Sequence, residues 1–328
     1  MPLNWIAKSL FCYDETIMEF DLVTVGGATV DLFLLIDPTN PHFKFNKETN
    51  ELSMHLGDKI VLDNAKFTVG GNAANVAVGV KRLGFKTLIF AEIGEDEFGH
   101  RILKTLKGEG VDTKKIIKGT QTSFSIILNY AKDRTIFTEK PEREHNFSFV
   151  GLKTEWIYLT SLGEKWEEAY RKVEDLIQKK KIKLAFNPGA TQLDKGLSSF
   201  SYLLSNTEVL IMNKEEGERI SNIKYQLSNI KELLLELKKL GPKIVVVTDG
   251  ENGSHAINEV GEIFYQEAVK VRVMSRTGAG DAYSSGFLGA LMAGKTLKEA
   301  MLWGTKNAAS VIRLIGAQAG LMKREEIM

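Results

Sequence analysis

The stretch TGAGDAYSSGFLGALMAGKT (Thr277–Thr296) decides the fold. Its end, GALMAGKT, matches a phosphate-binding pattern that acts as such only between a strand and a helix. Small side chains recur through the stretch at helical spacing, at Ala282, Gly286, Gly289 and Ala293. We therefore predict a single helix that ends at Gly294, where outward carbonyls repel phosphate rather than bind it.

The start of this helix favours phosphate chemistry. TGAGD (Thr277–Asp281) places Gly278, Ala279 and Gly280 at the helix N-terminus, with Asp281 in the first turn. Free N–H groups and the positive end of the helix dipole stabilise a transferred phosphoryl group. A carboxylate beside that anion hole can accept the proton of an acceptor hydroxyl. We predict Asp281 to be a general base, although a lone first-turn Asp is also common without any chemistry.

Length and composition are those of an ordinary α/β enzyme. The 328 residues contain 43 Lys and Arg against 42 Asp and Glu, a net charge of +1, which predicts neither a nucleic-acid partner nor a membrane patch. Cys12 is the only cysteine, so no intrachain disulfide is expected. No apolar run approaches the roughly 20 residues of a membrane span, and no signal peptide is evident. We expect a cytoplasmic protein with an N-terminal extension over residues 1–20.

From residue 21 to 328 strands and helices alternate, which predicts one α/β domain with a mostly parallel central sheet covered by helices on both faces. Two strand-like segments, about 32–66 and 118–142, interrupt this rhythm, the second as a hairpin turning at Ala131–Asp133. If they pair, they form a small β-sheet lid over the ligand edge of the main sheet. Lid sheets with exposed edges commonly associate, so we expect a homodimer through the lid.

Two signatures resemble the ribokinase-like (PfkB-type) carbohydrate and nucleoside kinases: GGNAANVAVGVKRLG (Gly70–Gly84) and the TGAGD helix some 200 residues later. The resemblance covers the chain from about Asp21. It implies a three-layer α/β/α ribokinase-like fold and an ATP-dependent kinase that phosphorylates a hydroxyl of a small sugar or sugar-like substrate. It also implies that the substrate hydroxyls bind to Asp31, Gly70, Gly71 and Asn75.

The resemblance implies a nucleotide site as well. Asn213 and Glu216 in NKEE match an element that organises Mg²⁺ through water, and the same pattern is a helix capping box. The remaining residues assigned to the nucleotide and its phosphoryl path are Asn187 in FNPG, Thr248, Gly250 and Gly253 in VTDGENG, and Thr305 and Asn307 in the tail. Some family members hold a monovalent cation near the TGAGD loop after an Asp-Thr pair, where this chain has Ser275-Arg276.

The sequence leaves the acceptor unnamed. A nucleoside kinase of the same fold is an alternative, and Phe124, Arg134 and Phe137 are lid residues that could contact the acceptor. A dinucleotide oxidoreductase built on TVGGATVD (Thr24–Asp31) is a weaker alternative, because no G-x-G-x-x-G follows the strand. A non-catalytic sugar-binding protein is a third, which Asp281 argues against.

Overall fold

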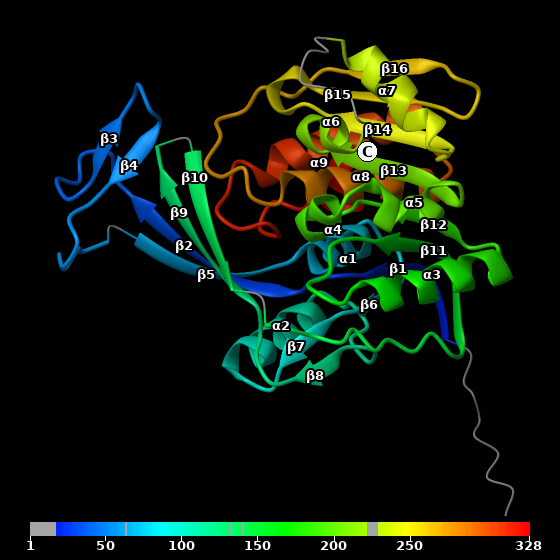
Figure 1. Cartoon of the computed structure of the whole chain (residues 1–328), viewed down its shortest axis with the longest axis horizontal. Helices are drawn as coiled ribbons and strands as arrows, with labels where there is room; N and C mark the ends of the chain where they lie inside the picture. The colour runs from blue at the N-terminus through cyan, green and yellow to red at the C-terminus, as the bar shows by residue number, and fades with distance from the viewer. Residues whose placement is uncertain (1–17, 63, 132, 140, 222–228) are drawn as a thin grey trace, which may run out of the picture.

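The computed structural model describes residues 18–62, 64–131, 133–139, 141–221 and 229–328 (Figure 1). Cys12 and most of the predicted N-terminal extension lie outside the described residues. The main element is an eight-stranded sheet, parallel except at one edge, where β14, β15 and β16 pair antiparallel. In order across the sheet the strands are β16 (Ile263–Gln266), β15 (Ser254–Ile257), β14 (Ile244–Thr248), β13 (Thr207–Asn213), β12 (Lys183–Phe186), β11 (Leu152–Leu159), β1 (Met18–Val25) and β6 (Thr87–Phe90).

Helices cover both faces of this sheet, as predicted. Successive strand residues point to opposite faces, so Leu22 joins one core and Val23 the other. The first core contains α1 (Asn72–Arg82), α8 (Ala279–Met292), α9 (Leu297–Val311) and α10 (Arg324–Ile327). The second contains α3 (Glu167–Lys180), α4 (Ala190–Lys195), α5 (Ser201–Leu204), α6 (Lys214–Ile220) and α7 (Ile230–Lys239). The predicted three-layer α/β/α architecture is confirmed.

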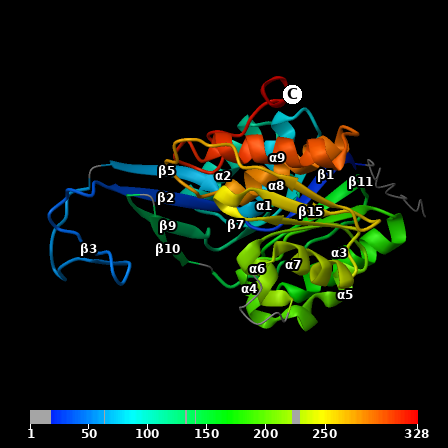
Figure 2. The same ribbon diagram turned by 90° about the horizontal axis from the view of Figure 1, so that it is seen from above.

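A second, smaller sheet projects from one side of the main body (Figure 2). In order its strands are β10 (Asp133–Glu139), β9 (Phe124–Tyr130), β2 (Thr29–Ile36) and β5 (Asn64–Gly70). The predicted hairpin is β9–β10, and parallel pairing of β2 with β9 joins the two segments that interrupt the strand–helix rhythm. We call these four strands the small sheet.

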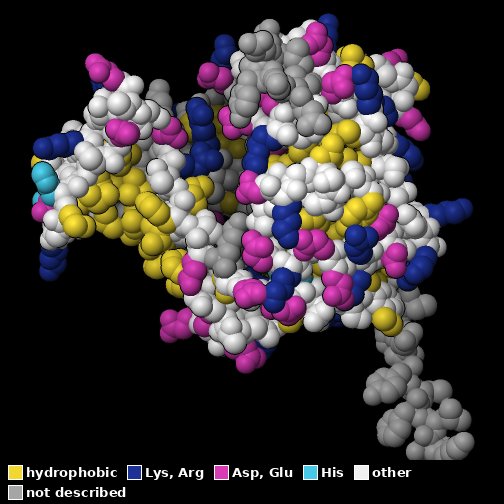
Figure 3. Space-filling model, in the orientation of Figure 1, with side chains coloured by type: hydrophobic (Ala, Val, Ile, Leu, Met, Phe, Trp, Pro, Cys, Tyr) yellow, Lys and Arg dark blue, Asp and Glu magenta, His cyan; other side chains and the backbone are white. Residues whose placement is uncertain are grey.

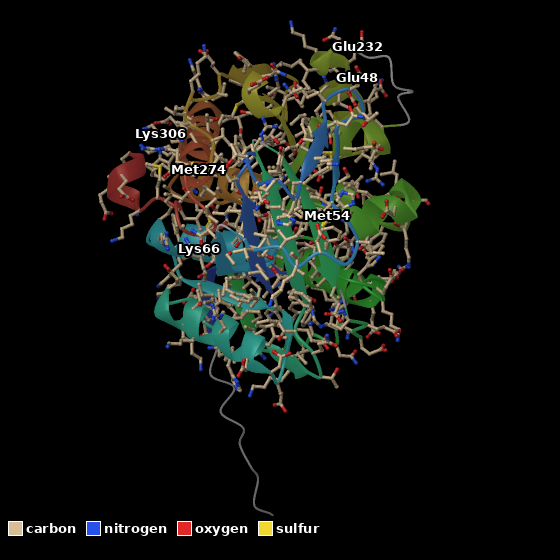
Figure 4. All side chains as sticks on the ribbon, turned by 90° about the vertical axis from the view of Figure 1, so that its left-hand side faces the viewer. Glu48, Met54, Lys66, Glu232, Met274 and Lys306 are labelled. Atoms are coloured by element: carbon tan, nitrogen blue, oxygen red, sulfur yellow. The ribbon has the colours of Figure 1, made fainter. Side chains whose placement is uncertain are left out.

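Short elements complete the described chain. They are β3 (Lys44–Asn46), β4 (Glu51–Ser53), β7 (Glu92–Gly94), β8 (Ile117–Gly119), α2 (Glu97–Gly108), and the 3-10 turns Leu197–Ser199 and Gly250–Asn252. Figure 4, which looks onto the small sheet from outside, labels Lys66 on β5 and Met274 before α8. The Lys66 ammonium donates to the Ile315 carbonyl at 3.1 Å and ties the small sheet to the segment after α9. No helix in the described ranges is both long and apolar enough to span a membrane.

The TGAGD stretch folds as one helix, α8, and excludes a phosphate loop at GALMAGKT. Gly294 follows the helix with φ +72°, and the Lys295 N–H donates to the Ala290 carbonyl at 3.0 Å, a common helix ending. Small residues let the neighbouring helices approach: a Cβ on Gly286 would stand 2.6 Å from the Trp303 carbonyl oxygen of α9. The small-residue stripe is therefore a packing surface.

Candidate functional site

Two cavities are lined by residues at the start of α8. Cavity A lies in the hollow between the small sheet and the main body (Figure 3), whereas cavity B is lined by the main body alone. Cavity A has a volume of about 360 Å³ and is lined by Gly278 and Asp281 on the α8 side. Cavity B has a volume of about 560 Å³ and is lined by Ala279 and Gly280. The first turn of α8 thus forms a shared wall between two chambers.

Cavity A brings together residues that lie far apart in the sequence. The residues singled out above that line it are Asp31, Gly71, Asn75, Asn187, Glu216, Gly278 and Asp281. They come from β2, the α1 start, the end of β12, the first turn of α6 and the α8 start. All of these segments lie at the same edge of the main sheet, where α/β proteins bind ligands.

Asp281 is held by a chain of amide side chains. The Asn75 Nδ2 donates to the Asp281 Oδ2 at 2.7 Å, and the Gln318 Nε2 donates to the Asn75 Oδ1 at 3.0 Å. Asn75 and Gln318 are buried. Because Gln318 holds the Asn75 amide, Asn75 presents its Nδ2 to the Asp281 carboxylate in a defined orientation.

Burial raises the pKa of Asp281 to about 6; the bond from Asn75 opposes this shift, and the negative charges of Asp31 and Glu216 add to it. The group is therefore mostly ionised at neutral pH but still able to hold a proton. A carboxylate tuned toward the working pH suits a general base.

Asp31 is the second buried carboxyl group in cavity A, with 6% of its surface exposed. Burial raises its pKa to about 6, and bonds from Thr29 and Ser125 oppose that shift. The Thr29 hydroxyl donates to the Asp31 Oδ1 at 3.2 Å. Gly70 does not line either cavity; a Cβ there would collide with the Asp31 carboxylate. Gly70 therefore lies behind the Asp31 carboxylate, where the absence of a side chain leaves room for that carboxylate.

Glycine is required at two turns of this site. Gly71 has φ +92°, and a Cβ would stand 2.6 Å from the Ala28 Cα. Gly278 has φ +81°, and a Cβ would stand 2.7 Å from the Ala317 Cα. In contrast, a Cβ on Gly280 would meet nothing within 4 Å, so the backbone there faces open space.

NKEE forms the capping box that its spacing predicts. The Asn213 side chain accepts from the Glu216 N–H at 2.8 Å, and the Glu216 carboxylate accepts from the Asn213 N–H at 3.0 Å. Asn213 lines neither cavity, whereas Glu216 lines cavity A. Burial raises the pKa of Glu216.

Asn187 also lines cavity A, and its side chain is held by the main sheet: its Nδ2 donates to the Ile211 carbonyl at 2.7 Å.

Cavity B is lined mainly by small and apolar residues. The residues assigned to the nucleotide that line it are Thr248, Gly250, Gly253 and Thr305, beside Ala279 and Gly280. Its apolar wall consists of Val269, Val271, Val273, Ala308 and Ile312. A flat heterocycle fits such a chamber, with polar atoms only at its rim.

Asn307 does not line cavity B, and its assignment to the nucleotide is corrected here. It is fully buried. Its Nδ2 donates to the Ala282 carbonyl at 2.9 Å and to the Ser285 hydroxyl at 3.0 Å, and its Oδ1 accepts from the Met322 N–H at 2.8 Å. With both of its polar atoms bonded inside the protein, Asn307 joins α9 to α8 and the C-terminal segment.

Two of the proposed acceptor contacts are wrong. Ser125 and Ile127 are the β9 residues that line cavity A, so Phe124 lies on the opposite face, where it packs against Phe98 with ring centroids 5.9 Å apart. On β10 the cavity-lining residues are Ile136 and Thr138. Alternation therefore turns Phe137 away and Arg134 toward the site.

Sequence reasoning missed three titratable residues that line cavity A: Glu92, Arg143 and His145. His145 is buried with φ +49°, and burial followed by the Arg143 charge lowers its pKa to about 4. Its Nδ1 lies 3.7 Å from the Glu92 carboxylate, and neither ring nitrogen makes a hydrogen bond of standard geometry. Arg143 and His145 lie in a segment without regular secondary structure and match no motif, so only the tertiary structure identifies them as residues of the site.

Comparison with known proteins identifies the family of this chain. The model of the pfkB family of carbohydrate kinases matches residues 35–324, so the chain belongs to that family. The family's kinases transfer a phosphoryl group from ATP to a sugar-like substrate, and this chain is such a carbohydrate kinase.

Relatives cover nearly the whole chain. The 5-dehydro-2-deoxygluconokinase of Halalkalibacterium halodurans is 26% identical over 95% of both chains, and that of Bacillus subtilis is 26% identical over 94% of both. Among solved structures, Arabidopsis thaliana ribokinase complexed with ribose and ATP matches with a TM-score of 0.75 and 21% identity, over 94% of this chain and 98% of that one. A Methanocaldococcus jannaschii nucleoside kinase matches with 0.70 and 23%, over 94% and 96%. These structures show the ribokinase fold.

The oxidoreductase alternative is wrong for a structural reason as well. The turn at Gly26 and Gly27 leads from β1 into strand β2 of the small sheet. A dinucleotide site of that kind needs a helix at this point, because the helix N-terminus binds the pyrophosphate.

Proposed function

We propose that cavity A binds the sugar-like acceptor, that cavity B binds the nucleoside of ATP, and that the phosphoryl group crosses at the first turn of α8. One observation carries this assignment: Gly278 and Asp281 line cavity A while Ala279 and Gly280, in the same turn, line cavity B. A donor and an acceptor placed on the two sides would meet at that turn.

Asp281 is the proposed general base. Its carboxylate takes the proton of an acceptor hydroxyl, the hydroxyl oxygen bonds to the γ-phosphorus, and the bond from that phosphorus to the β,γ-bridging oxygen breaks to release ADP. Asn75 holds the carboxylate in place. Asp31 would accept hydrogen bonds from other hydroxyls of the acceptor.

The backbone of Gly278, Ala279 and Gly280 is the proposed anion hole. These residues open α8, so their N–H groups lie at the positive end of its dipole and have no partner within the helix. The Ala279 N–H donates to the Arg276 carbonyl, just before the helix, at 3.3 Å. The open space at Gly280 leaves room for a phosphate. N–H groups aimed at developing charge lower the barrier without reorganisation.

The site fits a magnesium ion held mainly by its substrate. The described residues contain no cluster of three or more His, Cys, Asp or Glu side chains that could hold a metal. Glu216 on the cavity wall would bind the ion through water, together with the donor phosphates. When bound, the ion neutralises phosphate charge. Activation by a monovalent cation stays a prediction of the family resemblance.

The small sheet is the proposed lid. Ser125, Ile127, Ile136 and Thr138 line cavity A from that sheet, and exclusion of water there would limit hydrolysis of the donor. On the small sheet Phe67 and Phe137 are 45% and 56% exposed. A second copy of the chain is the proposed cover for these residues, and light scattering of the purified protein tests for a dimer.

The proposed acceptor class is a sugar acid. The curated relatives are named 5-dehydro-2-deoxygluconokinases, and Arg143 lines cavity A, where a guanidinium can bind a carboxylate. Burial lowers the pKa of Arg143, while Glu92 and Asp96 raise it. A carboxylate on the acceptor would add a further negative partner.

An acceptor screen tests this proposal. ADP release is measured with 5-dehydro-2-deoxygluconate, gluconate, ribose and adenosine. We expect the keto sugar acid to react fastest, and Arg143→Met to raise its KM at least about tenfold, the range of a charge-assisted hydrogen bond. The matched control is Arg101→Met, whose guanidinium stacks over Phe67 at 5.4 Å and lines neither cavity. Faster reaction with ribose or adenosine would contradict the sugar-acid class.

A further inference from the structure

A loop that packs on the start of α8 carries a buried glutamine, Gln318, which has no part in the mechanism above. Only 8% of its surface is exposed, and it lines neither cavity. The residue before it, Ala317, touches the proposed anion hole: a Cβ on Gly278 would stand 2.7 Å from the Ala317 Cα. Gln318 therefore lies close to the reacting groups but acts on them only through another side chain.

That side chain is Asn75. The Gln318 Nε2 donates to the Asn75 Oδ1 at 3.0 Å, and the Asn75 Nδ2 donates to the Asp281 Oδ2 at 2.7 Å. The two ends of an asparagine amide have nearly the same shape, but one donates and the other accepts. A donor fixed at the Oδ1 end therefore decides that the Nδ2 end faces Asp281.

The backbone of Gln318 is itself held by Arg82. The Arg82 Nη1 donates to the Gln318 carbonyl at 3.0 Å and to the Leu321 carbonyl at 2.8 Å. Its Nε and Nη2 donate to the Glu109 carboxylate at 2.9 and 2.7 Å. Arg82 ends α1, and Asn75 lies near the start of the same helix. One helix thus holds both the amide and the loop that orients it.

The orientation of this amide matters most after Asp281 has taken a proton. An ionised carboxylate only accepts hydrogen bonds, so it favours the Nδ2 end of Asn75 by itself. A protonated carboxyl group can also donate, and an amide free to turn would then offer its Oδ1 and retain that proton. With Gln318 in place, such a turn would bring two N–H donors together and leave both without a partner, which is costly for buried groups.

We propose that Gln318 is a positioning residue that keeps the Nδ2 of Asn75 toward Asp281 throughout the catalytic cycle. This rests on the proposed function, because it takes Asp281 as the general base. Since Asn75 occupies the Asp281 Oδ2, the proton of the acceptor hydroxyl goes to the Oδ1. It passes from there to water when the products leave, and the carboxylate is ready for the next acceptor.

Steady-state kinetics at pH 8 with MgATP and the fastest of the four acceptors named above test the inference. Gln318→Glu keeps the shape of the side chain but replaces its donor by an acceptor, which turns the Asn75 amide. We expect its kcat to fall at least about tenfold, while the KM for ATP stays within about twofold. Gln318→Met is the matched control. It removes the donor without turning the amide, so its kcat should fall less than about threefold.

The Asn75→Ala background separates the amide from the added charge. There Gln318→Glu should lower kcat further by less than about threefold, because the amide that it would turn is absent. Equal losses of kcat in Gln318→Glu and Gln318→Met would overturn the inference. A loss in the Asn75→Ala background as large as in the unchanged chain would do the same.

A second pair of variants tests the anchor of the loop and does not depend on whether Gln318→Glu folds. Arg82→Gln should lower kcat about threefold or more with an unchanged KM for ATP, since it frees the Gln318 backbone. Lys306→Gln is its control, because the Lys306 ammonium also donates to a backbone carbonyl, that of Ile327 at 2.9 Å. Thermal unfolding shows whether each variant is folded, and equal kcat in folded Arg82→Gln and Lys306→Gln would contradict the role of Arg82.

Failure of this inference is distinguishable from failure of the proposed function. Normal kcat in Gln318→Glu beside a strongly lowered kcat in Asp281→Asn would overturn the inference alone. Normal kcat in Asp281→Asn, or no reaction of the unchanged chain with any of the four acceptors, would overturn both.

Discussion

Asn75 and Asp281 stand 206 positions apart in the chain, yet the Asn75 Nδ2 donates to the Asp281 Oδ2 at 2.7 Å. Each residue belongs to one of the two family signatures, at the start of α1 and of α8. The bond therefore joins the two signatures, and it holds the proposed base toward cavity A. A hydrogen bond to a charged group contributes about 1.5–3 kcal/mol.

Asp281→Asn should strongly lower kcat, while Lys295→Ala should leave it nearly normal. Loss of a general base lowers kcat by roughly 10²–10⁴-fold. Lys295 follows Gly278 by 17 residues, about 25 Å along a helix, and its ammonium lies 3.6 Å from the Glu299 carboxylate at the far end. Steady-state kcat of the two purified variants decides this, with circular dichroism as the check on folding. An inactive Lys295→Ala beside an active Asp281→Asn would restore the phosphate-loop interpretation.

The pH profile of kcat should fall below about pH 6, because the pKa of Asp281 is raised to about 6 and the protonated form cannot accept a proton. The Asp31 charge is one cause of that raised pKa. Asp31→Asn should therefore move the acidic limb to lower pH, as removal of a neighbouring negative charge favours ionisation. Glu92→Gln is the control. Glu92 also lines cavity A but is not a cause of the raised pKa of Asp281, so the acidic limb of this variant should stay at the same pH. An unmoved limb in Asp31→Asn would contradict the coupling.

Gly71→Ala should destabilise the fold more than Gly196→Ala. Both glycines have positive φ, +92° and +86°, and forcing Ala into such a conformation costs about 1–3 kcal/mol. At Gly71 the new Cβ also meets the Ala28 Cα, whereas at Gly196 it meets nothing within 4 Å. Overpacking adds about 1–3 kcal/mol. Urea unfolding of both variants measures the difference, and equal losses would show that the backbone at Gly71 yields without cost.

Asn307→Ala should reduce stability and leave ATP binding unchanged. The substitution removes the bonds of Asn307 to the Ala282 carbonyl, the Ser285 hydroxyl and the Met322 N–H. Each of these groups that stays unsatisfied costs about 1–3 kcal/mol. Thr305→Val, two residues away on the wall of cavity B, should show the reverse pattern of weaker ATP binding and little loss of stability. The free energy of unfolding and the ATP dissociation constant are measured for both. Weakened ATP binding in a stable Asn307→Ala protein would return Asn307 to the nucleotide site.

The local sequence pattern was sufficient to predict those elements whose structure depends on residues close together in the chain. The small-residue spacing from Ala282 to Ala293 predicts α8, and its glycine-rich start predicts the turn that faces both cavities. The NKEE capping box was predictable for the same reason, since its two bonds join residues three apart. Alternating strands likewise predict the hairpin of β9 and β10.

Only the tertiary structure decided which side chains share a chamber. Asn307 and Thr305 are two residues apart on one helix, and packing alone directs the first into the protein and the second to cavity B. Arg143 and His145 line cavity A from a segment without regular secondary structure. Such a segment has no helical or strand periodicity from which the direction of its side chains could be predicted. The sequence by itself therefore determined the helices, the strands and the proposed catalytic turn, because short-range sterics and hydrogen bonds encode them. The partners of Asp281 were decided by long-range packing, which brings Asn75 and Gln318 beside it.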